Sequence, residues 1–414
     1  MKPTLKIGLF GGTFDPIHNA HLAIVEAAIE TAELRRVLIM PSGHPPLKDP
    51  AGVSPAIYRY RMAELAVRRS PQIEISDMEI RRTGPSYTVD TLKQLNCGLG
   101  SARDVHLICG TDVLFDLPNW HEPKGVLENC TLLVGTRPGF RTDSIQRQMN
   151  HLRHQYKAVI QTFDMPEMDL SSTEIRSRLI EFPQTDLPQV PQAVGEFIRR
   201  HRVYRDHLLL RELSDDTVRF LIRVQQELWN QITRERLLHS VGTALTAVRL
   251  ALRFGVDADK AAVAGILHDL AKELSPRDYL DEHPEQAHWL EDYPQIVHGP
   301  FGAQLARGRY GIDDQELLDA ITYHTTLRDN PSNLEKIIFL SDKIEPSRTF
   351  LDLKPIRELA RSDLNRAALA CLEAVRSSIL KRDQIEHPYS VDAALALTDA
   401  PGIPAIRKDD IVDD

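Results

Sequence analysis

The sequence has few cysteines and no long apolar run. Its four cysteines (Cys97, Cys109, Cys130 and Cys371) are scattered among 414 residues and form no C-x-x-C pair. This scarcity argues against a disulfide framework or a thiolate zinc site and indicates a reducing compartment. No uninterrupted apolar stretch approaches the roughly 18 residues that span a bilayer. The first residues, MKPTLKIGLFGGTFDP, also lack the apolar region and cleavage site of a secretion signal. We therefore expect a cytoplasmic protein with no membrane partner.

The sequence also lacks an excess of basic residues. It has 50 Lys and Arg against 59 Asp and Glu, which gives a net charge of −9. A surface that follows the phosphates of a nucleic acid usually shows a basic excess, so we expect no nucleic-acid partner. Small anionic ligands need only a local cluster of positive groups and backbone amides, and they stay possible. At 42% hydrophobic and 26% charged residues, the chain has the balance of a globular protein with two or three domains.

The first half of the chain alternates strand-sized apolar runs with amphipathic segments. The segments 20–34 and 56–70 have the pattern of helices. The strand-sized runs are KIGLF (6–10), RRVLIM (35–40), IEISDMEI (73–80), VHLICG (105–110), TLLVG (131–135) and KAVIQTF (157–163). Because strands that alternate with helices form right-handed crossovers, this half is predicted to be a doubly wound α/β domain with a parallel sheet.

After about residue 205 the strand signals give way to helical ones. Leu238, Val241 and Leu245 recur at steps of three and four residues, and Gly255 then supplies a helix stop. The segment VDADKAAVAGILHDLAKEL is expected to be the next helix, ending before Pro276. The second half is therefore predicted to be all-α. We divide the chain into domains at 1–207 and 208–392, followed by an acidic, flexible tail at 393–414.

The first candidate site directly follows the first predicted strand, in GGTFDPIHNAH. Gly11 and Gly12 let the backbone approach a phosphate, and the next helix offers its N-terminus to negative charge. His18 and His21 are three residues apart, so both fall on one face of the first helical turn. Two imidazoles there can donate hydrogen bonds to a phosphoryl group that is being displaced. A glycine turn beside two surface histidines is the alternative, but the combination at a strand-to-helix junction favours a phosphate site.

Other polar residues follow later strands, where open α/β sheets bind their ligands. Lys48 lies in PSGHPPLK after the second strand, and Asp112 lies in GTD after the fourth, where it suits ribose hydroxyls. Arg176 is in the first turn of a helix that begins DLSSTEIR. Ser-Ser-Thr-Glu is also a good helix cap, so this last motif taken alone fits either reading.

Six motifs, taken in order, resemble those of the bacterial nicotinate-nucleotide adenylyltransferases. They are GGTFDPIHNAH, PSGHPPLK, PSYTVDTL, ICGTDVLFDLPNWHEP, GTRPG and SSTEIR, and they cover about residues 5–205. The resemblance implies a Rossmann-like nucleotidyltransferase that transfers AMP from ATP to nicotinate mononucleotide. The products would be deamido-NAD and pyrophosphate, and Mg²⁺ would accompany the triphosphate of ATP.

The same resemblance implies roles for individual residues. The ATP-binding residues would be Gly11, Gly12, Thr13, Phe14, His18, His21, Gly110, Asp112, Ser172, Thr173 and Arg176. Of these, His18, His21 and Arg176 would be catalytic. Lys48 would bind the phosphate of nicotinate mononucleotide, Thr88 and Trp120 would frame the pyridine ring, and Arg137 would sit close to the same pocket. Tryptophan is more often a core or rim residue, but the turn-rich context LPNWHEP favours ring binding by Trp120.

The second candidate site consists of histidines and aspartates in the helical half. His239 is followed by the pair His268-Asp269 and, much later, by Asp342. An adjacent His and Asp can reach one divalent metal at a helix junction. His239 and Asp342 would then complete a four-residue site. His298 and His324 could then hold a second metal, with Asp269 bridging. A two-metal site activates water and clamps a phosphate during hydrolysis, which makes Asp269 the candidate catalytic residue. A single helical histidine is more often structural, but the order of these motifs along the chain favours a metal site.

The order His, His-Asp, Asp is that of the HD phosphohydrolase superfamily. The motifs LLHSVGTA, AGILHDLAKEL, HGPFGA, AITYHTT and LSDKIEPSR, over about residues 230–390, resemble the bacterial HD-domain hydrolases that split diadenosine tetraphosphate into two ADP. The resemblance implies one or two divalent metals (Fe, Mn, Co, Zn or Mg) on His239, His268, Asp269 and Asp342. His298 and His324 would serve the second metal or a substrate phosphate. Lys272 and Arg348 would neutralise the polyphosphate, although a solvated lysine is the alternative for Lys272.

We therefore expect a fusion of two enzymes, an adenylyltransferase of NAD synthesis and a metal-dependent hydrolase of diadenosine tetraphosphate. One alternative is that the helical half is a nucleotide-binding sensor without hydrolysis, and another is that it hydrolyses a different phosphorylated nucleotide. For the first half, the alternative is another acceptor such as pantetheine phosphate, which Thr88 and Trp120 disfavour. A homo-oligomer is compatible with the sequence.

Overall fold

The structure is a computed structural model that describes residues 6–46, 48–99, 105–136, 142–165, 168, 170–349, 353–382 and 384–398. The chain forms two compact units. The first comprises the residues up to His207 together with Gln225–Gln231, and the second comprises Leu208–Val224 and the chain from Ile232 onward. Among the helices of the described residues, none is both long and apolar enough to cross a bilayer.

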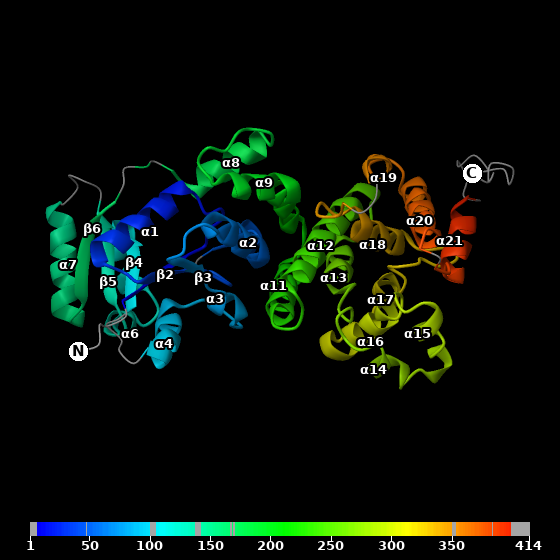
Figure 1. The fold of residues 1–414 in the computed structure, drawn as a ribbon, viewed down its shortest axis with the longest axis horizontal. Coiled ribbons are helices and arrows are strands. Elements are labelled where there is room, and N and C mark those ends of the chain that lie inside the picture. Colours follow the sequence, from blue (N-terminus) through cyan, green and yellow to red (C-terminus); the bar gives the residue numbers. More distant parts are fainter. Residues whose placement is uncertain are drawn as a thin grey trace. The chain divides into compact units, whose positions relative to one another are not determined.

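A six-stranded parallel sheet forms the centre of the first unit (Figure 1). The strands are β1 (Ile7–Gly12), β2 (Arg36–Pro41), β3 (Ile73–Ile75), β4 (Val105–Gly110), β5 (Thr131–Thr136) and β6 (Val159–Asp164). Their order is β3-β2-β1-β4-β5-β6, and every neighbouring pair is parallel. The order reverses between β1 and β4, which creates the switch point at which doubly wound sheets bind nucleotides. The predicted α/β fold is thus confirmed.

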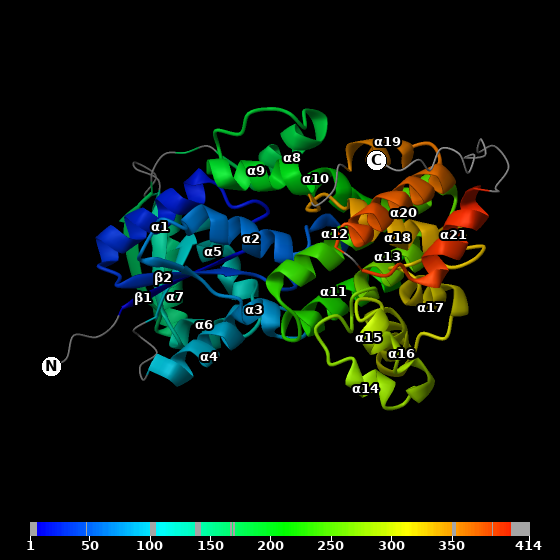
Figure 2. The ribbon, with the colours of Figure 1, turned by 45° about the vertical axis from the view of Figure 1, so that its right-hand side comes forward.

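Helices flank this sheet (Figures 1 and 2). They are α1 (Asn19–Ala32), α2 (Ala56–Val67), α3 (Met78–Arg81), α4 (Thr88–Leu99), α5 (Thr111–Asp116), α6 (Pro123–Glu128), α7 (Asp143–Tyr156), α8 (Ser172–Glu181), α9 (Gln192–His201) and α10 (Val203–Asp206). Side chains of β1, β4 and β5 pack with apolar residues of α4, α6 and α7 in one continuous core. Because strands covered on both faces need apolar residues at successive positions, these strands read as unbroken apolar runs rather than as alternating ones.

All six strands begin within two residues of the predicted runs, but the third is much shorter than expected. Of IEISDMEI, only Ile73–Ile75 is a strand, and Met78–Arg81 forms the short helix α3. Asp77 is the N-cap residue of this helix. Its side chain makes no capping hydrogen bond; the carboxylate accepts from Trp229 Nε1 at 2.9 Å and pairs with Arg81 at 2.8 Å. Aspartate is disfavoured in a central strand, and the apolar pattern alone therefore overestimated the strand.

The second unit is helical, as predicted. Its helices are α12 (Arg234–Phe254), α13 (Ala258–Leu267), α14 (Arg277–Leu280), α15 (Trp289–Asp292), α16 (His298–Tyr310), α17 (Gln315–Thr322), α18 (Asn333–Ile344), α19 (Lys354–Leu359), α20 (Leu364–Leu380) and α21 (Pro388–Thr398), and α11 (Asp215–Trp229) contributes residues to both units. Helix α18 is buried along almost its whole length and packs against α12, α13, α17 and α20. Gly255 ends α12 in the left-handed conformation, as its position in the sequence predicts.

Two boundaries in this unit differ from the expectation. Helix α13 ends at Leu267, and residues 268–274 form tight turns in which amides bond carbonyls three residues earlier, instead of continuing the helix. His268 is therefore the C-cap residue of α13. Helix α21 runs to Thr398 and buries Ala393 and Leu397, so the expected tail at 393–414 begins with six helical residues. The remainder, 399–414, lies outside the described residues.

Candidate functional site

The loop between β1 and α1 brings His18 and His21 into direct contact. His18 is the N-cap residue of α1, and its backbone N–H donates to Nδ1 of His21 at 3.2 Å. The two rings stack with their centroids 3.7 Å apart. Phe14, which is buried, packs edge-on against His21 at 5.2 Å. The expectation that both imidazoles share the first turn of this helix is confirmed.

Both imidazoles are neutral at pH 7. Burial lowers the pKa of His18 to about 4, and burial together with the charge of His18 lowers the pKa of His21 to about 3. Nδ1 of His18 is buried without a hydrogen-bond partner among the described residues. A buried polar nitrogen of this kind is costly unless a ligand completes it. An anionic oxygen at the N-terminus of α1 would do so.

Helix α8 is tied to the same loop. Its N-cap residue, Ser171, accepts from the amide of Glu174, while Ser172 Oγ donates to the carbonyl of Pro16 at 2.9 Å. Arg176 donates to the carbonyl of Asp15 at 2.8 Å and to Thr173 Oγ1 at 3.2 Å. Ser-Ser-Thr-Glu is thus a helix cap, and the same segment brings a guanidinium to the loop that carries His18.

The ends of β1 and β4 carry the other residues predicted to bind ATP. Gly11 is exposed at the end of β1, and Gly110 ends β4. Asp112 is exposed in the first turn of α5. Because β1 and β4 are paired in the sheet, these residues border the switch point together.

Two neighbouring residues, Ser86 and Tyr87, join three segments that carry the predicted nicotinate mononucleotide contacts. The Ser86 hydroxyl accepts from the amides of Gly43 and His44 at 3.0 and 3.2 Å, in the loop that leads to Lys48. The ring of the next residue, Tyr87, packs at a tilt against that of His121, with the centroids 4.3 Å apart. Thr88 and Trp120 directly adjoin this ring pair in the sequence, so the two segments lie together. Arg137 lies outside the described residues.

Arg59, which the sequence analysis did not single out, holds this loop region together. It lies on α2 and is 1% exposed. Its guanidinium donates to the carbonyls of Thr13 at 3.0 Å and Ser42 at 2.7 Å, and also to those of Gly43 and Ser54. Thr13 follows β1 and Ser42 follows β2, so a single side chain fixes both ligand loops. An arginine in a helical segment is normally expected at the surface, and nothing in the local sequence reveals this role.

Replacing Arg59 with methionine would leave four carbonyls without their donor. We expect the free energy of unfolding of the first unit to fall by at least about 3 kcal/mol, because hydrogen bonds from a charged donor contribute roughly 1.5–3 kcal/mol each. The matched control is Arg61→Met on the same helix, which removes a partly exposed ion pair with Glu64; it should cost about 1 kcal/mol or less. Urea denaturation measures both, and equal losses would contradict this role for Arg59.

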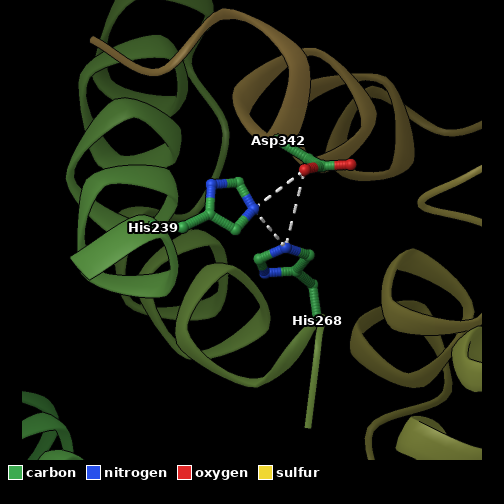
Figure 3. A group of neighbouring side chains, drawn as sticks. All are labelled: His239, His268 and Asp342. Carbon is green, nitrogen blue, oxygen red and sulfur yellow. Dashed lines mark hydrogen bonds and ion pairs between the residues drawn. The ribbon is translucent and has the colours of Figure 1, made fainter. Parts of the chain in front are cut away.

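In the second unit, His239, His268 and Asp342 converge from three helices (Figure 3). His239 lies on α12, His268 at the end of α13, and Asp342 on α18. His239 Nε2 lies 3.0 Å from Asp342 Oδ1 and 3.2 Å from His268 Nε2. A Cβ on Gly265 would lie 2.6 Å from Ala244 Cα, so this glycine allows α13 to approach α12 closely enough for the two histidines to meet.

Asp269 joins this group to two further histidines. Its Oδ2 lies 3.6 Å from His268 Nε2 and 3.8 Å from His239 Nε2. Its other oxygen, Oδ1, lies 3.2 Å from His298 Nε2 and 3.6 Å from His324 Nε2. The structure therefore brings together all six residues predicted as ligands, and the Asp269 carboxylate lies between the two groups.

The donor set fits divalent metal ions. Two overlapping groups of three, His239-His268-Asp342 and His268-Asp269-His324, each place their ligand atoms within 4.8 Å of one another. Nδ1 of His268 donates to the carbonyl of Gly265 at 2.8 Å, and Nδ1 of His324 donates to that of Ile321 at 2.7 Å. These bonds leave each Nε2 with its lone pair directed at the group, as in metal-binding histidines.

Burial lowers the pKa of His239, but its hydrogen bonds with Asp342 and Glu345 outweigh burial and raise it. The pKa shifts of the other perturbed ligands agree with metal binding. Burial lowers the pKa of His268 to about 3 and that of His298 to about 4, so both are neutral at pH 7. Burial alone would raise the pKa of Asp269, but His268 and the hydrogen bonds from His298 and His324 hold it well below the usual value. Burial opposes ionisation of Asp342 too, and the neighbouring Lys343 and His239 outweigh it. Neutral imidazoles and ionised carboxylates are the forms that bind metal.

Cationic side chains surround the carboxylates. Arg348 lies 2.7 Å from Asp342 Oδ1, and Lys272 Nζ lies 3.2 Å from the ring nitrogens of His298. Lys272 thus contacts the site instead of only solvent. Two more cations were missed by the sequence analysis: Arg236, 2.5 Å from Asp269, and Lys343, 2.7 Å from Asp342. Arg236 precedes His239 by one helical turn, a spacing that could have revealed it.

The fold and these donors define a protein with a nucleotidyltransferase-type α/β unit and a helical unit with the ligands of an HD metal site. Comparison with protein families agrees: residues 9–178 match the cytidylyltransferase-like family, and residues 236–347 match the HD domain family.

Several known proteins are similar to this chain. A probable nicotinate-nucleotide adenylyltransferase from Thermomicrobium roseum is 40% identical over 200 residues, which cover 48% of this chain and 92% of that protein. A probable nicotinate-nucleotide adenylyltransferase/Ap4A hydrolase from Mycoplasma pneumoniae is 27% identical over 377 residues, covering 89% of this chain and 98% of that one. A crystal structure of an HD superfamily hydrolase from Clostridium acetobutylicum, described as involved in NAD metabolism, is 34% identical and covers 42% of this chain and 95% of that chain, with a TM-score of 0.40. Through its first unit, the chain belongs to the nicotinate-nucleotide adenylyltransferase family, and its second unit is an HD domain.

Proposed function

We propose that the chain is a bifunctional enzyme. The first unit transfers AMP from MgATP to nicotinate mononucleotide, forming deamido-NAD and pyrophosphate. The second unit hydrolyses diadenosine tetraphosphate symmetrically to two ADP. The observation that carries the proposal is that each half has its own cluster of candidate site residues. A relative whose name contains both activities is similar over 89% of the chain, which supports the same pairing. The four unpaired cysteines support the cytoplasm as its compartment.

In the first reaction, His18 and His21 would bind the phosphates of ATP. As neutral imidazoles, they donate one N–H each to phosphate oxygens without repelling Mg²⁺. Arg176 offers a guanidinium from α8, and the N-terminus of α1 adds backbone amides, so negative charge that develops on the leaving pyrophosphate is stabilised. Lys48 would bind the phosphate of the acceptor, and Thr88 with Trp120 would frame its pyridine ring.

In the second reaction, His239, His268, Asp269 and Asp342 would hold a divalent metal, and His298 and His324 a second one on the other side of Asp269. Such ions supply an activated water and polarise a phosphate. Four histidines in the set favour Fe, Mn, Co or Zn over Mg. Arg236, Lys272 and Arg348 would neutralise the tetraphosphate and orient it for attack at its centre.

Chromatography of the products from diadenosine tetraphosphate tests the second activity. With Mn²⁺ or Fe²⁺ we expect ADP as the only product, and excess chelator should abolish its formation. AMP together with ATP would contradict the symmetrical cleavage. Intact substrate with every metal would contradict hydrolysis of this nucleotide and support the sensor or another substrate.

An acceptor panel tests the first activity independently. With MgATP, the full chain should form a dinucleotide and pyrophosphate from nicotinate mononucleotide. Pantetheine phosphate should be a much poorer acceptor. Equal or preferred use of pantetheine phosphate would overturn the assigned acceptor.

A further inference from the structure

His239 differs from its neighbours in what its second ring nitrogen contacts. Nδ1 of His268 and of His324 bond backbone carbonyls, whereas Nδ1 of His239 lies 3.1 Å from Oε1 of Glu345. A carboxylate is a stronger and charged acceptor, and it polarises the ring further than a carbonyl does. Of the four histidines of the site, His239 is the one for which the described residues provide a carboxylate outside the predicted ligand set.

Glu345 is built into this position. It is completely buried, and it directly follows α18 as its C-cap residue. Its carboxylate accepts from the amide of Ser347 at 2.8 Å and from the Ser347 hydroxyl. Arg357 donates to the carbonyls of Ile344 and Glu345 at 3.0 Å each and so fixes the turn that carries Glu345.

Helix α12 makes room for this carboxylate. Gly242 lies one turn after His239 on the same helix, in a buried position where glycine costs about 1 kcal/mol relative to alanine. A Cβ on Gly242 would lie 2.8 Å from Oε2 of Glu345. The glycine is thus explained by the close approach of Glu345 to α12 beside His239.

We propose that Glu345 is a positioning residue of the metal centre: it holds His239 with the proton on Nδ1 and directs Nε2 at the metal. Because an ionised carboxylate can only accept, it excludes the tautomer whose Nε2 carries the proton and cannot bind a metal. The group of His239, His268 and Asp342 would therefore bind its ion more tightly than the same group would if a backbone carbonyl took the place of Glu345. The inference rests on the proposed metal site, and it is tested without substrate.

The test is Mn²⁺ binding to the full-length protein, measured by the electron paramagnetic resonance signal of free Mn²⁺. Glu345→Gln keeps the shape but removes the charge, and its amide N–H can donate to Nδ1 and so favour the wrong tautomer. We expect the affinity for the tighter-bound Mn²⁺ to fall about 10- to 100-fold, the usual loss when such an outer partner of a metal-binding histidine is removed.

Two further variants separate this role from a purely structural one. Glu335→Gln changes another buried glutamate, which lies in the first turn of α18 and pairs with Arg328 from the segment before that helix. It should leave Mn²⁺ affinity unchanged even if it lowers stability. Gly242→Ala displaces the Glu345 carboxylate without changing a ligand and should weaken Mn²⁺ binding as Glu345→Gln does. Thermal unfolding with chelator shows whether each variant is folded.

The outcomes distinguish the two proposals. Wild-type affinity in Glu345→Gln, equal losses in Glu345→Gln and Glu335→Gln, or no Mn²⁺ binding by the wild type would each overturn the role of Glu345. Wild-type Mn²⁺ binding that Glu345→Gln weakens, without any hydrolysis of diadenosine tetraphosphate, would support the positioning role and contradict the proposed substrate.

Discussion

Asp269→Asn is expected to lower hydrolysis of diadenosine tetraphosphate by about 10³-fold or more, while adenylyl transfer continues at the wild-type rate. Among the described residues, Asp269 is the carboxylate that reaches both histidine groups, with Oδ2 near His239 and His268 and Oδ1 near His298 and His324. Asparagine has the same shape but carries no charge and offers one oxygen instead of two. Since loss of an outer partner alone costs roughly 10- to 100-fold, loss of this shared ligand costs more. Rates of ADP and deamido-NAD formation by the same preparation measure the two activities together.

The control for this substitution is Asp281→Asn, an exposed aspartate of the same unit. It should change neither rate by more than about twofold, since surface substitutions rarely matter. A variant at Asp269 that retains more than a tenth of wild-type hydrolysis would show that the metal centre does not depend on a shared carboxylate. Loss of both activities together would instead indicate a general folding defect and contradict the independence of the two sites.

The sheet could be predicted from the sequence because the signals for strands and helices lie in short, continuous segments of the chain. Six apolar runs and the helical segments between them are enough to define a parallel sheet, since crossover handedness leaves few other topologies. The errors lie at element ends. The short helix α3 begins after Asp77, inside an apolar run, and α13 ends at Leu267, where the chain turns before Asp269. Both differences lie within a few residues of an element boundary, where propensity is weakest and tertiary contacts decide.

The candidate sites were predicted from motifs, and what the motifs missed acts over long sequence distances. Arg59 bonds carbonyls as far away as Thr13, and Glu345 bonds His239 across 106 residues. Neither residue is among those proposed to bind a substrate or a metal, so neither belongs to a motif with the spacing of such residues. LSDKIEPSR contains both Asp342 and Glu345, yet the sequence singles out only the residue that completes the donor set. The side chains that position the ligands could be identified only from the three-dimensional structure.

His18→Ala is expected to slow adenylyl transfer by about 10²- to 10⁴-fold and to leave hydrolysis of diadenosine tetraphosphate unchanged. His18 is a buried neutral imidazole whose Nδ1 has no partner within the described part of the chain. Removing one preorganised donor to a developing charge typically costs 10²- to 10³-fold in rate, and His21, which stacks on His18, would lose its support as well. Because the defect concerns charge in the transition state, kcat should fall much more than KM for ATP rises. Steady-state kinetics of deamido-NAD formation separate the two constants.

The control is His154→Ala, which changes an exposed histidine in the last turn of α7, and it should not affect either reaction.

The low pKa of His18 provides a second test, the pH dependence of stability. In the unfolded chain this histidine has its ordinary pKa of 6.5, whereas burial in the folded unit lowers its pKa to about 4. As pH falls from 6.5 towards 4, the unfolded state therefore gains protons that the folded state does not, and stability is lost. His18→Ala should reduce that loss, seen as a smaller change in the urea midpoint between about pH 7 and pH 5. Near-wild-type kcat, or an unchanged pH dependence of stability, would contradict a buried, neutral His18 at the phosphate site.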